Sequence, residues 1–315
     1  FPLSASGGFA PSDPVPEDPI GDFGLDLLTG KDPLNISGPT SASRDSNGLL
    51  DSVDARAIFL NSGAIIPSSI LIANELSKLG RKPAIIKKFY KNHFDEHNLI
   101  NKYFKDLILP NKRSEGIINA TSRGFDIVIL DDGFQDYSIK KDLNIICFNQ
   151  KQLLGNELIF PAGPLRQKIN SLRDAQIVII NGKKNVPFED KILKINNNIE
   201  FYYSRFKPLN IDHFKNKKLF AIAGIGNPNN FFDLLSEQGC IIEKKLSFPD
   251  HYKFNKSEIL NMIDYSLKNK LQIVMTEKDY FKVKSFNFDK IDYLKIELEI
   301  ENSSKLFEKI IKLYA

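Results

Sequence analysis

The feature that most constrains this chain is the alternation of short apolar runs with helical stretches beyond residue 56. The runs are rich in β-branched residues and lack polar alternation, as in parallel strands buried on both faces. They are AIFL at 57–60, PAIIKKF at 83–89, DIVIL at 126–130, LNIICF at 143–148 and AQIVIIN at 175–181. Helical periodicity separates them, for example over residues 67–79. This order predicts a doubly wound α/β layer fold on a parallel sheet.

A second series of strand and helix patterns begins near residue 209. Strand-like KLFAIAGIG, CIIEKKLSF and LQIVMTEKD alternate with helix-like NPNNFFDLLSEQG and NKSEILNMIDYSLKNK, and SSKLFEKIIKLYA forms a closing helix. Gly239 ends the first of these helices, and Asn255 or Ser257 is available to cap the second. We therefore predict a larger α/β domain over residues 56–208 and a smaller α/β domain over residues 209–315.

Residues 1–55 differ from the rest in composition. They are rich in Pro, Gly, Ser and Asp, show no apolar periodicity and carry a net charge of −7, so the remainder carries +11. We expect an acidic, disordered tail followed by a basic body. The basic body suits nucleotide phosphates, an anionic lipid or a membrane surface, although a lysine-rich solvated surface gives the same count. We expect no nucleic-acid partner.

Three further absences limit the class of protein. No run approaches the roughly 18 apolar residues that a membrane span needs. The first residues lack the basic and apolar regions of a signal peptide. Cys147 and Cys240 lie far apart without metal-ligand spacing, which favours buried thiols in a reducing compartment.

Two adjacent acids give the strongest local signal for chemistry. In FDIVILDDGFQD (125–136), a buried strand delivers Asp131 and Asp132 at its C-terminal end, with Gln135 close by. Ligands bind at that edge of open parallel sheets, and paired carboxylates there suit a hard cation that bridges phosphates. An acidic turn without a ligand is the alternative interpretation.

The stretch NSGAIIPSSILIANEL (61–76) has the layout of a phosphate-binding loop but not its residues. A strand runs into a small-residue loop and then a helix. A working loop reads G-x-x-x-x-G-K-[ST], whose lysine binds the β/γ-phosphates and whose hydroxyl binds Mg²⁺. Here Gly63, Ala64, Ile65 and Ile66 occupy the corresponding region.

Other polar residues follow strands or rigid turns. Arg166, after the Pro-Ala-Gly-Pro turn at 161–164, could hold a phosphate bidentately, or it could simply be solvated. Asp250 and His251 follow a strand, and His251 could act as a base, although a lone histidine is more often structural. MTEKD (275–279) reads equally as an ordinary charged strand end, and AGIGNP (223–228) as a tight turn or a weak dinucleotide signal.

Taken together, these segments resemble one family. ILDDGFQD, GNELIFPAGPLR, FAIAGIGNPNNFF, SFPDHYKF and MTEKD follow the order and approximate spacing of tetraacyldisaccharide 4'-kinase, the lipid A 4'-kinase. The resemblance covers roughly residues 57–315. It implies a P-loop-type kinase, with a P-loop-like domain over residues 56–208. Such a kinase transfers the γ-phosphate of ATP, with Mg²⁺, to the 4'-hydroxyl of a tetraacylated glucosamine disaccharide 1-phosphate. It also implies a peripheral protein at the cytoplasmic face of the bacterial inner membrane.

The resemblance also assigns roles to individual residues. Asp131 and Asp132 match the family's metal-binding acid pair, with Gln135 adjacent, and Arg166 matches the arginine of PAGPLR. His251, after Asp250, matches the first histidine of the family's DHH, which assists catalysis. Aligning HFDEHNLI (93–100) with the family's GDEP segment makes Asp95 the candidate catalytic base.

The departures from the family concentrate near the loop. Where the family has GKTP, alignment on Pro67 gives Ile65 for the lysine and Ile66 for the threonine, and the family's SRGYGG becomes KKFYKN at 87–92. In one hypothesis the activity persists with a cation from elsewhere, such as Lys87 or Lys88. In a second the chain is an inactive homologue that binds lipid or nucleotide. In a third the front end is a scrambled or chimeric sequence, so that the family membership holds but the activity does not.

The altered loop and the unusual tail lie together, which favours the second or third hypothesis. A non-catalytic lipid- or nucleotide-binding protein is thus the main alternative to a kinase. An oxidoreductase with a Rossmann fold would depend on AGIG alone.

Overall fold

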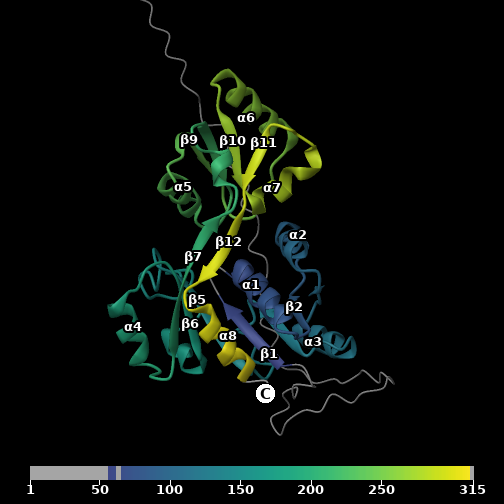
Figure 1. The fold of residues 1–315 in the computed structure, drawn as a ribbon, viewed down its shortest axis with the longest axis vertical. Coiled ribbons are helices and arrows are strands. Elements are labelled where there is room, and N and C mark those ends of the chain that lie inside the picture. Colours follow the sequence, from purple (N-terminus) through teal and green to yellow (C-terminus); the bar gives the residue numbers. More distant parts are fainter. Residues whose placement is uncertain (1–55, 62–64, 313–315) are drawn as a thin grey trace, which may run out of the picture. The chain divides into compact units, whose positions relative to one another are not determined.

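The computed structural model describes residues 56–61 and 65–312, with side chains from residue 66 onward. The predicted tail over residues 1–55 and the loop residues Gly63 and Ala64 lie outside the described residues. Two mainly parallel sheets with helices on their faces make up this part of the chain (Figure 1). The predicted fold class is confirmed.

The larger sheet has eight strands in the order β12-β7-β6-β5-β1-β4-β2-β3. All neighbours run parallel except β12, which is antiparallel to β7. The strands are β1 (Arg56–Asn61), β2 (Pro83–Lys87), β3 (Leu107–Ile108), β4 (Ile127–Asp131), β5 (Leu143–Asn149), β6 (Ile177–Asn181), β7 (Glu200–Pro208) and β12 (Ile296–Ile300). From β1 the sheet extends through β4 in one direction and β5 in the other, so β4 is a central strand.

Helices cover both faces of this sheet, which explains why its strands read as unbroken apolar runs. The helices are α1 (Ile65–Lys78), α2 (Phe94–Tyr103), α3 (Arg113–Ser122), α4 (Val186–Leu193) and α8 (Ser303–Lys312). Apolar residues of α1, α2 and α8 form one core with the sheet. Those of α3 and of α4 belong to two other cores, with the alternate residues of the strands.

The smaller sheet is parallel, with the strand order β11-β10-β8-β9. Its elements are β8 (Lys218–Ala223), α5 (Pro228–Glu237), β9 (Ile241–Ser247), α6 (Lys256–Lys268), β10 (Gln272–Thr276), α7 (Glu277–Val283) and β11 (Ile291–Leu294). One core lies with α5 and a second with α6 and α7. Asn255 caps α6 in a capping box with Glu258.

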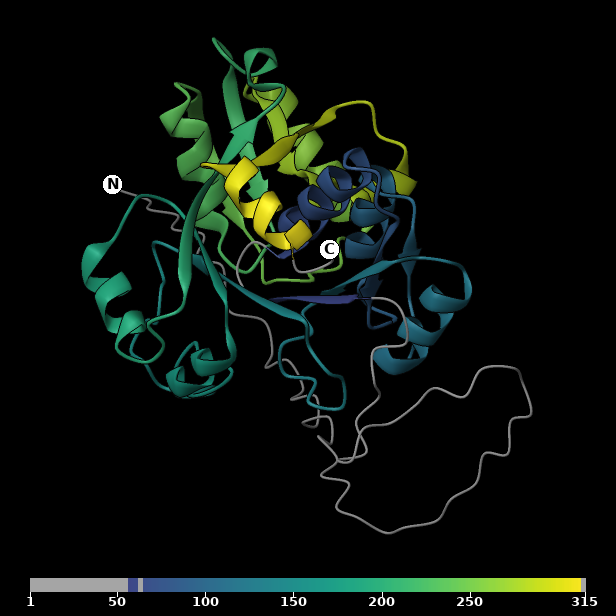
Figure 2. The same ribbon diagram turned by 60° about the horizontal axis from the view of Figure 1, so that its bottom comes forward.

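The closing helix does not remain with the smaller sheet. After β11 the chain forms β12 against β7, and α8 then packs on the larger sheet (Figure 2). It buries Leu306, Phe307 and Ile310 in the core that contains α1. The amphipathic pattern of α8 specifies that one face is buried but not which sheet buries it. The elements of the smaller sheet thus span residues 218–294, and a domain division at 208/209 stays a prediction.

Candidate active site

The acid pair lies at the carboxyl edge of the larger sheet. Asp131 is the last residue of β4 and is 1% exposed. Asp132 follows with a φ of 57°, a left-handed conformation that aspartate adopts more readily than most residues. A residue held in this conformation is a candidate for a functional role.

Both carboxylate oxygens of Asp131 receive a hydrogen bond. Ser69 Oγ, in α1, donates to Oδ1 at 2.7 Å, and Lys87 Nζ donates to Oδ2 at 2.5 Å. Lys87 ends β2 and is the register partner of Asp131. Burial alone would lower the pKa of Lys87, but the charges of Asp131 and Glu96 outweigh burial and raise it. Lys87 is therefore a permanent cation against this acid.

Asp132 faces two arginines. Arg166 Nη1 lies 2.8 Å from one carboxylate oxygen of Asp132 and 2.6 Å from the other. Arg113 Nη2 donates to the main-chain oxygen of Asp132 at 2.7 Å. The structure thus brings Arg166, predicted to hold a phosphate, onto the acid pair itself. Gln135 lies half-buried in the turn after β4.

Asp95 and His251 come together from distant segments of the chain. Asp95 lies in the first turn of α2, is 1% exposed, and neither of its carboxylate oxygens has a hydrogen-bond partner among the described residues. His251 Nδ1 lies 3.9 Å from Asp95, and Lys282 Nζ lies 3.8 Å away on α7. A buried carboxylate without hydrogen bonds is costly, so such a group needs a functional explanation.

Glu96 connects these two groups of residues. It lies 3.0 Å from Lys87 and accepts a hydrogen bond of 2.8 Å from Lys278, which also donates to Asp250 at 3.0 Å. Burial would raise the pKa of Glu96, but Lys87 and Lys278 lower it to about 2. One network of fixed charges therefore extends from Asp131 on β4 to Asp250 beside His251.

The histidine of the site favours its neutral form. Burial lowers the pKa of His251, and the charge of Lys278 lowers it further, while Asp250 acts in the opposite direction. The ring of His93 stacks on His251 with centroids 4.1 Å apart. A neutral imidazole beside Asp95 can accept or relay a proton.

Two sets of side chains could supply metal ligands. Donor atoms of His93, Glu96 and His251 lie within 4.8 Å of one another. Two of these three donors are imidazole nitrogens, which suit transition metals rather than Mg²⁺. Asp131 and Asp132 offer only carboxylate oxygens, which Mg²⁺ prefers, and the chemistry of this donor set fits that ion.

The substituted loop contributes no polar side chain where α1 is described. Ile65 is the first residue of α1, and Ile66 is half-buried and packs against the core of the larger sheet. Sequence reasoning missed Ser69, which lies one helical turn after Ile66 and therefore on the same side of α1. The spacing of these two residues was the signal that could have found it.

The MTEKD segment is a structural junction at the start of α7. Thr276 caps the helix, and the carboxylate of Asp279 accepts hydrogen bonds from the main-chain N–H of Gly224 at 2.7 Å and from Thr276 Oγ1 at 2.6 Å. Lys282 Nζ lies 2.8 Å from the same carboxylate. AGIGNP therefore forms a turn that the hydrogen bond from Gly224 to Asp279 stabilises.

We expect Asp279→Asn to lower the free energy of unfolding by about 3 kcal/mol, because it leaves the buried ammonium of Lys282 with less compensation. Urea denaturation measures this change. The exposed Asp264→Asn on α6 is the matched control and should shift stability by less than about 0.5 kcal/mol. A loss of similar size in both variants would contradict a structural role for Asp279.

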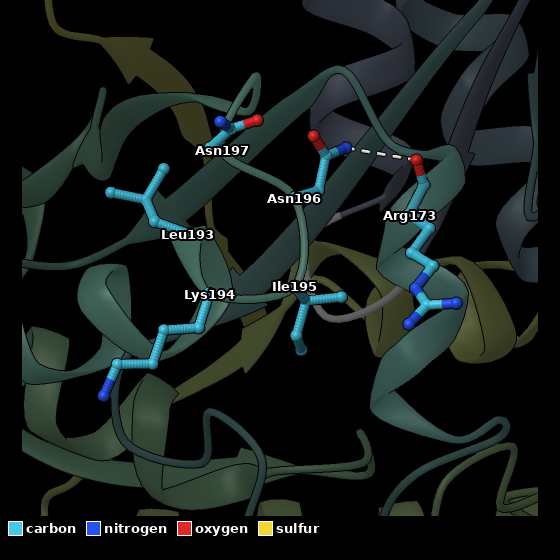
Figure 3. Close-up of a pocket in the computed structure, with 6 residues that line it drawn as sticks. All are labelled: Arg173, Leu193, Lys194, Ile195, Asn196 and Asn197. Atoms are coloured by element: carbon cyan, nitrogen blue, oxygen red, sulfur yellow. Dashed lines mark hydrogen bonds between the residues drawn. The ribbon is translucent and has the colours of Figure 1, made fainter.

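A separate hollow is lined by Arg173 and residues 193–197 (Figure 3). Asn196 Nδ2 donates to the main-chain oxygens of Arg173 and Ala175 at 3.1 and 2.9 Å, so its amide is committed to holding the backbone. None of the predicted site residues lines this hollow. The acid pair and the Asp95–His251 pair remain the candidate active site.

A parallel α/β sheet whose carboxyl edge carries an acid pair with facing cations is typical of nucleotide-dependent phosphotransferases. Comparison with known proteins narrows this class. A family model described as tetraacyldisaccharide-1-P 4'-kinase (LpxK) matches residues 90–315. The chain belongs to this family of kinases.

Individual relatives agree with this assignment. The tetraacyldisaccharide 4'-kinase of Pelagibacter ubique is 35% identical over 277 residues, covering 87% of this chain and 88% of the relative. That of Haemophilus influenzae is 30% identical, covering 79% and 80%. The crystal structure of LpxK from Aquifex aeolicus in complex with ATP shares the fold, with a TM-score of 0.61 at 19% identity over 85% of this chain and 91% of that one.

Proposed function

We propose that the chain transfers the γ-phosphoryl group of ATP to the 4'-hydroxyl of a tetraacylated glucosamine disaccharide 1-phosphate, with Mg²⁺. The observation that supports this proposal most directly is that one lysine contacts both the acid pair on β4 and the acidic segment at the start of α2. Lys87 contacts Asp131 at the end of β4 and Glu96, whose neighbour Asp95 approaches His251. A metal-binding acid pair and a candidate base thus share one charged network, as in-line phosphoryl transfer requires.

Asp95 is the base in this mechanism. Its carboxylate, which has no hydrogen-bond partner in the described part of the chain, accepts the proton of the 4'-hydroxyl. In the same step the sugar oxygen forms its bond to the γ-phosphorus and the bond to the ADP oxygen breaks. Neutral His251, 3.9 Å away, orients the carboxylate and the attacking hydroxyl. The charge network around Glu96 holds α2 and the segment of Asp250 together, which positions this pair.

The acid pair serves the nucleotide. Asp131 and Asp132 would hold Mg²⁺, which neutralises charge on the β- and γ-phosphates. Arg166, exposed on its loop beside Asp132, is suited to bind a phosphate oxygen bidentately when the nucleotide arrives. Gln135 remains a proposed neighbour of the nucleotide.

Two observations favour an active kinase over the inactive and chimeric-front-end hypotheses. Lys87 provides a cation at the acid pair despite Ile65 and Ile66. The Pelagibacter match covers 87% of the chain, so a continuous match of this length must include residues 61–76, whichever end it omits. The altered loop therefore lies within sequence that is similar to the family.

A peripheral position at the cytoplasmic face of the inner membrane belongs to the same proposal. No helix in the described part of the chain is long and apolar enough to cross a bilayer. The acylated substrate would be reached at the membrane surface, and the net charge of +11 beyond residue 55 favours contact with anionic lipids.

The test is an assay of γ-labelled ATP with the disaccharide lipid in mixed micelles, beside an equilibrium titration of ATP. We expect the label on the lipid and saturable ATP binding. ATP binding without transfer would support the non-catalytic alternative. The same titration with NAD excludes the oxidoreductase interpretation when no binding is found.

We expect transfer to fall as the pH drops below the lowered pKa of His251. The neutral imidazole is present above that pKa, so activity is retained at pH 7 and is lost only under more acidic conditions. His93, Asp95, Glu96, Asp250 and Lys278 are the charged or titratable groups that face this ring. A pH profile of kcat measures the effect, and an acid limb at or above the ordinary histidine range would contradict it.

A further inference from the structure

The first residues of α1 lack the cation and the hydroxyl that a phosphate-binding loop supplies. Phosphoryl transfer depends on cations that hold the β- and γ-phosphates and neutralise the developing charge. Ile65 and Ile66 occupy the positions of a phosphate-loop lysine and hydroxyl, and Ile66 packs into the core. Neither side chain can donate to a phosphate, so another group must supply the charge.

Lys87 lies where such a charge is needed. It ends β2, the strand beside β4, and its ammonium contacts Asp131 Oδ2 at 2.5 Å and Glu96 at 3.0 Å. The residue is 8% exposed, and its ammonium forms ion pairs with both acids. A lysine is a point charge on a flexible stem, so Lys87 can exchange a carboxylate for a phosphate oxygen without backbone movement.

Ser69 completes the arrangement from α1. Its hydroxyl is fully buried and donates to the other carboxylate oxygen of Asp131 at 2.7 Å. It lies three residues after Ile66, on the same side of the helix. One acid therefore receives both a hydroxyl and an ammonium group, the two functions that the loop has lost.

We propose that Lys87 provides the phosphate-binding cation of this chain and that Ser69 positions Asp131 for the metal. This inference rests on the proposed kinase function and adds two residues outside the loop to its machinery. Lys87 contacts ATP and is a catalytic residue in this proposal. Ser69 acts through Asp131 and is a positioning residue. The simpler alternative is a structural ion pair that only neutralises a buried carboxylate.

The decisive variant is Lys87→Met, which keeps the length of the side chain and removes its charge. We expect kcat to fall about 100-fold, as when one preorganised donor to a transition state is lost. ATP affinity by calorimetry should weaken about tenfold, both with Mg²⁺ and in EDTA, because the lysine contacts the phosphates directly. Lys87→Arg should recover part of the kcat and part of the ATP affinity, because arginine keeps the positive charge.

Two controls separate this role from folding. Lys78→Met removes an exposed lysine at the far end of α1 that pairs only with Glu75 among the described residues, and it should leave both readouts within about twofold. In Lys87→Met/Asp131→Asn no unpaired carboxylate remains, so the melting temperature should recover while ATP binding in EDTA stays weak. Recovery of ATP affinity together with stability would overturn the proposal.

Ser69→Ala should raise the Mg²⁺ concentration for half-maximal rate about tenfold, without changing ATP affinity in EDTA, and Ser69→Thr should restore it. An unchanged Mg²⁺ dependence would overturn the role of Ser69.

Failure of the parent function is distinguishable from failure of this inference. If the wild type binds ATP but does not phosphorylate the disaccharide, the kinase proposal fails, and the comparison of ATP affinities still decides the role of Lys87. If Lys87→Met binds ATP and turns over within about twofold of wild type, Lys87 is structural and the inference is wrong. A wild type without ATP binding contradicts both.

Discussion

Replacing Asp95 with asparagine should reduce phosphoryl transfer about a thousandfold and leave ATP affinity nearly unchanged. Asparagine keeps the volume of the side chain but cannot accept the hydroxyl proton, and general-base catalysis contributes about 10²- to 10⁴-fold. Asp95 is suited to this role because it is 1% exposed and neither oxygen has a hydrogen-bond partner among the described residues. Single-turnover assays with saturating ATP measure the chemical step directly.

The same variant should make the protein more stable. A buried carboxylate without hydrogen bonds is unfavourable, and Lys282, 3.8 Å away, keeps its closer ion pair with Asp279 at 2.8 Å. The neutral replacement should therefore raise the melting temperature, whereas most core substitutions lower it. Asp264→Asn on the exposed side of α6 is the control for both readouts. Near-normal turnover by Asp95→Asn would show that the alignment of HFDEHNLI with the family's acidic segment is wrong.

The strands of the larger sheet were the most predictable part of the fold. Runs such as DIVIL and LNIICF have apolar residues on both faces, and only a sheet covered by helices on both sides satisfies them. β7 was missed because its residues alternate between buried and exposed, and its pattern EFYYSRFKP lacks a continuous apolar run. α8 was recognised as a helix, but its place against the larger sheet depends on the pairing of β12 with β7.

Only part of the candidate site could be predicted from the sequence. Asp131 and Asp132 could be found because the end of a buried strand fixes where their backbone lies. The approach of His251 to Asp95 required the tertiary arrangement of segments more than 150 residues apart in the sequence. Lys87 was one of two candidate cations, and strand register, which no local pattern reveals, selects it as the partner of Asp131.

Asp132→Ala should abolish detectable transfer. Asp132 is the more accessible acid of the pair, with its side chain 31% exposed, and it would bind the metal that neutralises the triphosphate. Loss of a metal-binding carboxylate removes charge stabilisation that this reaction depends on almost entirely, and we expect a decrease of at least about a thousandfold in kcat.

Alanine at this position also strains the backbone, because φ is 57° at Asp132. Asp132→Asn separates the two effects, since asparagine tolerates the left-handed conformation but lacks the negative charge. We expect Asp132→Asn to retain the wild-type melting temperature, to lose transfer nearly as fully as alanine, and to require much more Mg²⁺ for ATP binding. Calorimetric titrations of ATP over a range of Mg²⁺ concentrations measure this shift.

The matched control lies just before the opposite end of the same strand. Asp126 precedes β4 at its amino edge, where it accepts a hydrogen bond from the main-chain N–H of Lys82 at 2.8 Å. Asp126→Asn should leave both turnover and Mg²⁺ dependence within about twofold of wild type. If Asp132→Asn behaves in the same way, Asp132 does not bind the metal, and the pairing with Arg166 is a surface ion pair without a catalytic function.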